Sequence, residues 1–129
     1  MSEARFALII RPDCSFDVID WPAELAAGLN TLAREFTTTR IAEFRLWQDL
    51  SLWTDSYATH ETAPINCAVT GVHCALGYDS ENYYGPAAFT GGLTCTADGT
   101  HSGLTLKECH ELLKLTGIDV PTMPKPRTK

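Results

Sequence analysis

The segment FALIIRPDCSFDVIDWPAELAAGLNTLAREF, residues 6–36, contains two strand patterns followed by one helix pattern. Its first five residues are continuously apolar, which is typical of a strand buried on both faces. A turn-forming cluster at residues 11–15 separates them from a second strand at 16–21, so we predict an antiparallel hairpin. Apolar residues at helical spacing then predict an amphipathic helix with a buried face of Leu25, Leu29, Leu32, Ala33 and Phe36.

The sequence also predicts the local structure around two residues of this helix. Pro22 suits the first turn of a helix, where a missing backbone N–H costs nothing. Gly28 lies inside the helix at some cost in helix propensity, which suggests that a strand passes close to it. The β-branched residues 37–39 are expected to end the helix.

The rest of the chain alternates strands and helices. Residues 38–47 and 50–57 are predicted strands joined by a tight turn, although a helical turn near residues 42–46 is also compatible with the pattern. Asn66 is the expected N-cap of a helix at 67–76, and residues 83–90 lead into a strand. Thr105 and Glu108 form a capping-box pattern before a last helix that Gly117 ends.

This order of elements, β-β-α-β-β-α-β-α, predicts the α+β class with a mixed, mostly antiparallel sheet and about three helices. The length of 129 residues fits one domain, which we place at residues 1–120. The Pro-rich basic residues 121–129 are expected to form a flexible tail, since an exposed chain end is the commoner role than a polyproline ligand.

The net charge and the hydropathy of the chain argue against several classes of binding partner. The chain has 10 basic and 16 acidic side chains and a net charge of −6, which argues against nucleic acid or an anionic membrane as the main partner. No uncharged stretch is long enough for a spanning helix, and residues 1–5 lack the pattern of a signal peptide. We therefore expect a soluble protein of the cytoplasm.

The cysteines support a reducing compartment. Their number, five, is odd and no C-x-x-C pair occurs, so a disulfide framework is not indicated. The favoured interpretation is that they are small buried hydrophobic residues. They are Cys14, Cys67, Cys74, Cys95 and Cys109.

Several short motifs resemble a family of small domains of unknown function found largely in phages and actinobacteria. The resemblance covers most of the chain and rests on residues 8–13, the helix at 25–36, residues 53–55, 63–66, 84–91 and 103–105. It implies no activity and no catalytic residues. It does imply a phage-encoded or mobile-element protein that works in the cytoplasm of a bacterial host.

The helix at 67–76 lacks a charged face, so three roles are open for it. Burial in the core is favoured, and a subunit interface or a pocket wall is the alternative. The small-residue face would then form a homo-oligomer contact or bind a ligand through Cys67, Thr70, Gly71 and Cys74. Asn66 and the amides after it could also receive an anion, although capping alone explains this residue equally well.

Catalytic and metal-binding patterns are weak. Cys67, His73, Cys74, Cys109 and His110 could supply metal ligands, but adjacent pairs on a helix diverge by about 100°, so we predict no metal site and no cofactor. No cysteine has a local signature of a nucleophile, and no phosphate-binding glycine motif or paired-carboxylate motif occurs. We therefore lean against an enzyme.

The aromatic residues are a better indication of function. Trp and Tyr are enriched at binding hot spots and also stack on bases. The candidate binding residues are Trp47, Trp53, Tyr83 and Tyr84. A nucleotide between them could place its phosphate on Arg40 or Arg45, whereas the plainer interpretation is that the tryptophans pack the sheet.

We therefore predict a non-enzymatic protein that binds a host protein, with inhibition of a host enzyme or a defence system as its biological form. The step to a host target rests on the family resemblance alone. One alternative is a small-molecule module that sequesters a nucleotide signal. A second alternative is a small cysteine-dependent enzyme.

Overall fold

The computed structural model describes residues 6–22, 24–47, 50–78, 81–91 and 103–117. It confirms the α+β class and the predicted order of elements. The elements are β1 (Phe6–Ile10), β2 (Phe16–Asp20), α1 (Leu25–Phe36), β3 (Ile41–Trp47), β4 (Leu50–Asp55), α2 (Cys67–Ala75), β5 (Ala87–Thr90) and α3 (Leu106–Leu115). The predicted tail at 121–129 lies outside the described residues.

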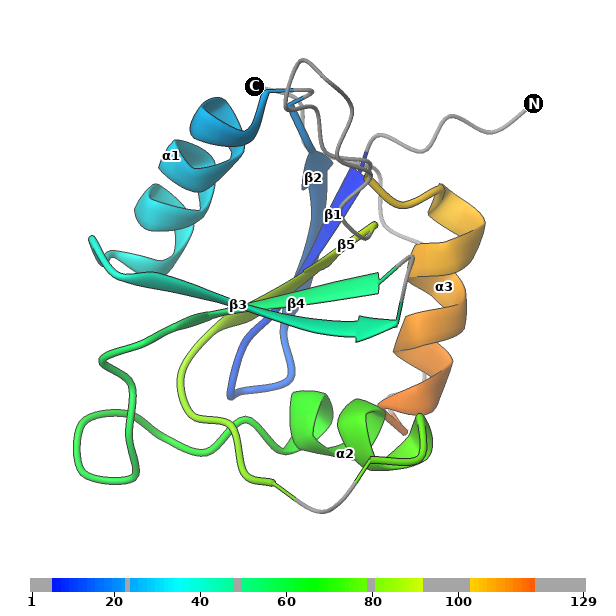
Figure 1. Cartoon of the computed structure of the whole chain (residues 1–129). Coiled ribbons are helices and arrows are strands. Elements are labelled where there is room, and N and C mark those ends of the chain that lie inside the picture. Colours follow the sequence, from blue (N-terminus) through cyan, green and yellow to red (C-terminus); the bar gives the residue numbers. More distant parts are fainter. Residues whose placement is uncertain (1–5, 23, 48–49, 79–80, 92–102, 118–129) are drawn as a thin grey trace.

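The five strands form one sheet in the order β2-β1-β5-β4-β3 (Figure 1). Every pairing in this sheet is antiparallel. The hairpins β1–β2 and β3–β4 lie on either side of β5, which is the last of the described strands in the sequence. Phe89 of β5 is paired with Leu8 on one side and with Leu52 on the other.

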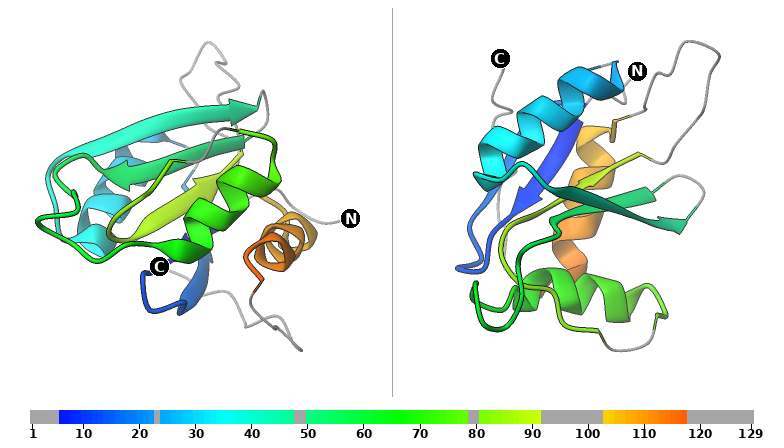
Figure 2. Two further views of the ribbon diagram at one scale, coloured as in Figure 1. Left: turned by 90° about the horizontal axis from the view of Figure 1, so that it is seen from below. Right: turned by 60° about the vertical axis from the view of Figure 1, so that its left-hand side comes forward.

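Helices cover both faces of the sheet, so there are two hydrophobic cores (Figure 2). Successive strand residues point to opposite faces. In β1 this sends Ala7 and Ile9 toward α1, and Leu8 and Ile10 toward α2 and α3. All five residues of β1 are buried, which confirms the prediction, from the continuous apolar pattern of residues 6–10, of a strand buried on both faces.

Helix α1 begins at Leu25, three residues after Pro22, so the proline is not in its first turn as expected. Gly28 also has a different neighbour from the one expected. A Cβ atom at this position would lie 2.6 Å from Cη2 of Trp21. The ring of Trp21, which is 4% exposed, packs over the glycine where the sequence suggested a strand.

The two helices on the other face have the predicted N-caps. Asn66 accepts a hydrogen bond from the N–H of Val69 at 3.2 Å. The capping box of α3 is complete, because the N–H of Glu108 donates to Thr105 Oγ1 and the N–H of Thr105 donates to the Glu108 carboxylate. None of the described helices is both long and apolar enough to cross a lipid bilayer.

Asn66 also joins segments that are far apart in the sequence. Its side chain is fully buried, and its Nδ2 donates to the carbonyl oxygens of Ile10 at 3.0 Å and Gly85 at 2.9 Å. Its backbone N–H donates to the carbonyl of Tyr83 at 2.7 Å. One residue therefore connects the end of β1, the start of α2 and the segment that precedes β5.

The contact between Gly28 and Trp21 predicts opposite effects of one substitution in two helices. Gly28→Ala forces the indole to move, and we expect a loss of about 1–3 kcal/mol in the free energy of unfolding. Gly71→Ala in α2 is the matched control, because its Cβ would meet only a carbonyl oxygen of Thr116 at 4.0 Å. It should gain up to about 1 kcal/mol from helix propensity. Urea unfolding of both variants checks the difference, and equal effects would contradict it.

Asn66→Asp tests the buried amide. The variant keeps the capping oxygen but loses both donors and places a carboxylate against two carbonyl oxygens, so we expect a loss of about 2–4 kcal/mol at neutral pH. Burial raises the pKa of this carboxyl above the value of about 3.9 in the unfolded chain. The loss should therefore be smallest below about pH 4 and grow as the pH rises. Unfolding of Asn30→Asp, an exposed site in α1, provides the control at each pH.

Candidate functional site

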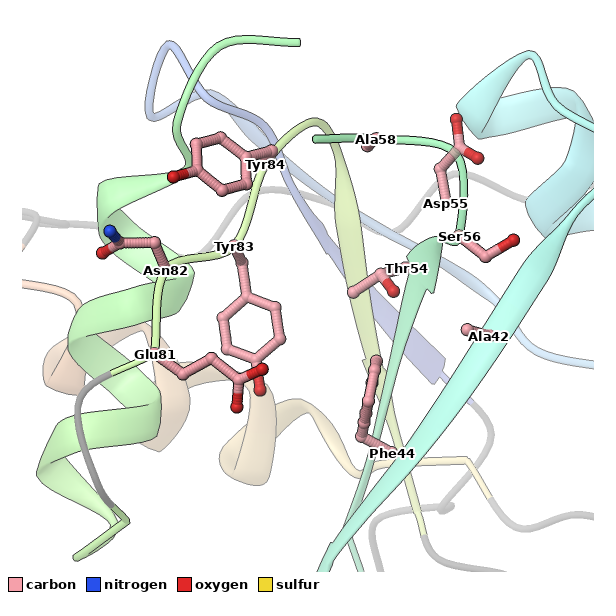
Figure 3. Close-up of a pocket in the computed structure, with 10 residues that line it drawn as sticks. All are labelled: Ala42, Phe44, Thr54, Asp55, Ser56, Ala58, Glu81, Asn82, Tyr83 and Tyr84. Atoms are coloured by element: carbon pink, nitrogen blue, oxygen red, sulfur yellow. The ribbon is translucent and has the colours of Figure 1, made fainter. Parts of the chain in front are cut away.

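A pocket of about 240 Å³ lies on the sheet face that carries α2 (Figure 3). One wall comes from β3, β4 and the residues after β4, and the other from the segment that leads into β5. The strand wall consists of Ala42, Phe44, Thr54, Asp55, Ser56 and Ala58. The opposite wall consists of Glu81, Asn82, Tyr83 and Tyr84.

Local sequence explains why these walls face each other. Phe44 is paired with Leu52 in the β3–β4 ladder, so its ring shares the sheet face of the α2-side core. The backbone N–H of Tyr83 donates to Thr70 Oγ1 of α2 at 3.1 Å, which holds the second wall on the helix. Gly85, with φ of +76°, then turns the chain into β5, and its conformation is one that L side chains rarely adopt.

Aromatic rings form a row from the pocket to α2. Phe44 and Tyr83 meet edge to face with centroids 6.1 Å apart, and Tyr83 contacts His73 in the same way at 5.3 Å. His73 stacks on Tyr78 at 4.9 Å. Phe44 is 42% exposed, whereas Tyr83 is only 6% exposed. The row therefore begins at an exposed ring and ends in the stack of the buried His73 on the partly buried Tyr78.

The carboxylate beside this row belongs to Glu81. Figure 3 shows its side chain directed along Tyr83 toward the phenol end of the ring. Burial, and secondarily the charge of Glu81, raise the pKa of Tyr83 to about 12, so the phenol stays neutral. The carboxylate of Asp55 points away from the rings and accepts hydrogen bonds from Thr38 Oγ1 and the N–H of Tyr57. The pocket thus combines aromatic rings with one exposed negative charge.

Two further contacts involve residues that are close in sequence to the pocket lining. The guanidinium of Arg40 lies over the ring of Tyr57, with its carbon 5.1 Å from the ring centroid. Tyr57 itself is 57% exposed. The rings of His60 and Tyr84 lie 6.3 Å apart next to the second wall. These contacts add aromatic and basic groups that are close in sequence to a pocket lining with the carboxylates of Asp55 and Glu81.

A second hollow, of about 420 Å³, lies between β4, α2 and α3. Its lining is mainly leucine, with Leu50, Leu76, Leu104, Leu112 and Leu115, and includes Glu108 and Glu111. The Glu108 carboxylate is used by the capping box, and Glu111 lies 3.8 Å from Lys114. This groove offers apolar contact but few free polar groups to select a ligand.

The structure brings together two of the predicted binding residues and separates the others. Tyr83 and Tyr84 both line the pocket. Trp53 is 3% exposed, and its indole N–H donates to Thr90 Oγ1 at 2.8 Å, so its ring is not open for the stacking that the sequence suggested. Trp47 lies in β3, but its side chain is outside the described part of the structure.

The two arginines do not form one phosphate site with the tryptophans. Arg40 lies over the ring of Tyr57 and is not among the residues that line the pocket. Arg45 is exposed on β3, and alternation along the strand places its side chain on the opposite face from Phe44. Asn66 is fully buried with both ends of its amide hydrogen-bonded, so its side chain serves the fold and has no capacity left for an anion.

The small-residue face of α2 is partly used within the domain. Thr70 holds the backbone of Tyr83, and Gly71 lies near the end of α3. Cys67 and Cys74 are exposed, so a homo-oligomer contact through these two residues stays a prediction. Ala75, in the last turn of the helix, is also exposed.

The interpretation of the cysteines as buried residues is wrong for three of the four described. Cys14, Cys67 and Cys74 are exposed, and only Cys109 is buried. Burial, together with the nearby charge of Glu108, raises the pKa of the Cys109 thiol to about 12. Cys95 lies outside the described residues. Within the described ranges, His, Cys, Asp and Glu side chains do not gather in any group of three that could hold a metal ion.

Sequence reasoning missed Phe44 and Glu81, which give the pocket its character. The sequence does not show which face of the sheet α2 covers, so strand alternation alone does not predict that Phe44 is exposed. Residues 42–46 also fit a helical turn, which makes the alternation itself less certain from the sequence. Glu81 lies in a polar loop with no pattern of its own. Comparison with family models, with curated proteins and with solved structures finds no match, so the resemblance to the phage-associated family stays a prediction.

The exposure of the cysteines predicts their reactivity. Iodoacetamide should modify Cys14, Cys67 and Cys74 in the native protein, because these thiols are exposed and the reagent can reach them. Cys109 should react only after unfolding, since it is buried and its pKa is raised to about 12. Peptide mapping by mass spectrometry with and without urea checks this. Equal labelling of Cys109 and Cys14 in the native state would contradict it.

Proposed function

We propose that this chain is a non-enzymatic binding domain that recognises a protein partner by receiving an arginine side chain of that partner in the pocket of Figure 3. The observation that carries the proposal is the combination of the open ring of Phe44, the fixed ring of Tyr83 and the exposed carboxylate of Glu81. The proposal keeps the protein partner that the sequence favoured and gives it a site.

The chemistry of the walls supports a cation. An arginine guanidinium stacks on an aromatic face and binds a carboxylate through paired N–H donors. Phe44 offers the face and Glu81 the carboxylate. Such a contact contributes about 0.5–1 kcal/mol at an exposed site and about 2 kcal/mol when it is desolvated. The net charge of −6 adds a long-range attraction to a basic partner.

The size of the pocket supports a single side chain. Sites for drug-sized ligands have volumes of about 300–1,000 Å³, whereas this pocket has about 240 Å³. A nucleotide would also bring its phosphate close to Glu81. These two features make the nucleotide-binding alternative less favourable at this site.

The cysteine-dependent enzyme gains no support from the geometry of the described residues. In these ranges no histidine is hydrogen-bonded to Cys14, Cys67 or Cys74, although a histidine general base normally contacts its nucleophile. The resemblance adds that the partner is a protein of a bacterial host and that the domain modulates it, with inhibition of a defence system as one form.

An NMR titration tests the pocket with a defined probe. N-acetyl-arginine amide should shift the backbone amides of β3 and of residues 81–84, whereas N-acetyl-citrulline amide, its neutral analogue, should not. Glu81→Gln should weaken the binding by about two- to fivefold, as expected for loss of an exposed ion pair. Glu111→Gln on α3 also removes an exposed negative charge and should leave the affinity unchanged.

The pattern of shifts decides the outcome. Equal shifts with the citrulline probe would contradict recognition of a cation. Shifts centred on α3 and the leucine-lined groove would move the site to that groove. Phe44→Ala separates the two contributions, because it removes the aromatic face and leaves the Glu81 carboxylate in place.

A further inference from the structure

Strand β3 forms one edge of the sheet, and its outer side has no partner strand within the described residues. Its inner side is paired with β4 from Ile41 to Trp47. An exposed edge strand presents unpaired N–H and C=O groups and can pair with another strand. The strand also carries Phe44, an aromatic ring that is 42% exposed.

The register shows which backbone groups face outward. The N–H of Ser56 donates to the carbonyl of Arg40 at 2.9 Å, so the backbone of residue 40 faces β4. In an antiparallel ladder this direction alternates from one residue to the next. The backbone groups of Glu43 and Arg45 therefore face away from β4, while those of Phe44 face it.

The two residues beside Phe44, Glu43 and Arg45, carry opposite charges, so this segment is complementary to a second, antiparallel copy of itself. If a second β3 pairs antiparallel about a two-fold axis at Phe44, Glu43 of each copy lies opposite Arg45 of the other. These are also the residues whose backbone groups face outward, so they would form the hydrogen-bonded pairs of the new ladder. Directly opposite side chains have Cβ atoms about 4.5–5.5 Å apart, which allows an ion pair.

The described contacts leave these groups available. Arg45 is exposed and makes no ion pair among the described residues, and Glu43 is partly exposed with one carboxylate oxygen bonded to the hydroxyl of Ser51 at 2.7 Å. On the other face the two Phe44 rings would lie opposite each other. A register shift between Arg45 and Trp47 distorts the strand beyond this point, so residues 43–45 would form the centre of the contact.

The other edge of the sheet lacks this complementarity. Strand β2 carries Asp17 and Asp20 and no basic residue, and Asp17 is already paired with Arg11. Two β2 edges would therefore bring like charges together, which disfavours pairing. The contrast points to β3 as the edge suited to a second copy of the chain.

We propose that two copies of this chain form an antiparallel dimer through β3, with the two-fold axis at Phe44 and reciprocal ion pairs between Glu43 and Arg45. The dimer joins the two five-stranded sheets into one continuous sheet. This inference does not rest on the proposed arginine pocket, although Phe44 takes part in both. Alternation along β3 places the side chains of Glu43 and Arg45 on the sheet face opposite that pocket.

Charge reversal tests the register as well as the contact. Glu43→Arg leaves two positive side chains beside Phe44, and Arg45→Glu leaves two negative ones. Each variant should be monomeric alone in sedimentation equilibrium, under conditions where the unsubstituted chain is a dimer. Mixed in equal amounts, the two variants should form a heterodimer, because every position then faces an opposite charge. The double variant should form a homodimer again.

Arg34→Glu is the matched control, because it reverses an exposed charge on α1, outside the proposed contact, and should leave the dimer intact. Circular dichroism shows that each variant is folded before its mass is measured. A monomeric unsubstituted chain, or a dimer indifferent to both reversals, would overturn the proposal. Because Phe44 and Glu81 are unchanged, the arginine titration of the monomeric Arg45→Glu variant reports on the pocket separately.

Discussion

The fold depends on the buried side-chain amide of Asn66. A buried amide is tolerable only when its donors and its acceptor are all satisfied, because each unpaired polar group costs about 1–3 kcal/mol. Here the donors bind the carbonyls of Ile10 and Gly85, and the oxygen caps α2. No other residue type offers two donors and one acceptor in so short a side chain. The amide therefore fixes the start of α2 relative to the end of β1 and the entry to β5.

The pocket is a consequence of that arrangement. Once Asn66 and Thr70 hold the backbone of Tyr83, its ring is placed between α2 and β3. His73 supports the ring from the helix side and Phe44 meets it from the sheet side. Tyr83 is thus rigid for structural reasons, and an aromatic surface that is ordered in advance loses little conformational entropy when a ligand binds.

Local signals were sufficient to predict the elements but not their arrangement. The apolar run of residues 6–10, the capping box at Thr105 and the cap at Asn66 each act over a few residues, so the sequence alone identifies them. Strand order depends on pairings between distant segments, such as Leu8 with Phe89, for which the sequence contains no local pattern. The bonds of Asn66 to Ile10 and Gly85 are equally non-local, and only its capping role could be foreseen.

The same difference between local and non-local information explains which residues of the candidate site the sequence predicts. Tyr83 and Tyr84 were identified because their residue type is common at binding sites, and both line the pocket. Trp53 was selected on the same ground, but the position of its strand between β3 and β5 buries it. Residue type predicts the capacity to bind, whereas exposure follows from the packing of segments distant in sequence. Glu81 and Phe44 become informative only when the two walls are seen together.

The central place of β5 has a consequence for how the chain folds. The two hairpins each involve neighbours in sequence and can form on a microsecond timescale. The strand that unites them comes last among the described strands, so both hairpins present an unpaired inner edge until Ala87–Thr90 arrives. Non-local pairing of this kind is slow because loop closure must precede the gain in contacts. During synthesis the sheet therefore stays open until Ala87–Thr90 has been made, and until then its unpaired hairpin edges are the segments most exposed to aggregation.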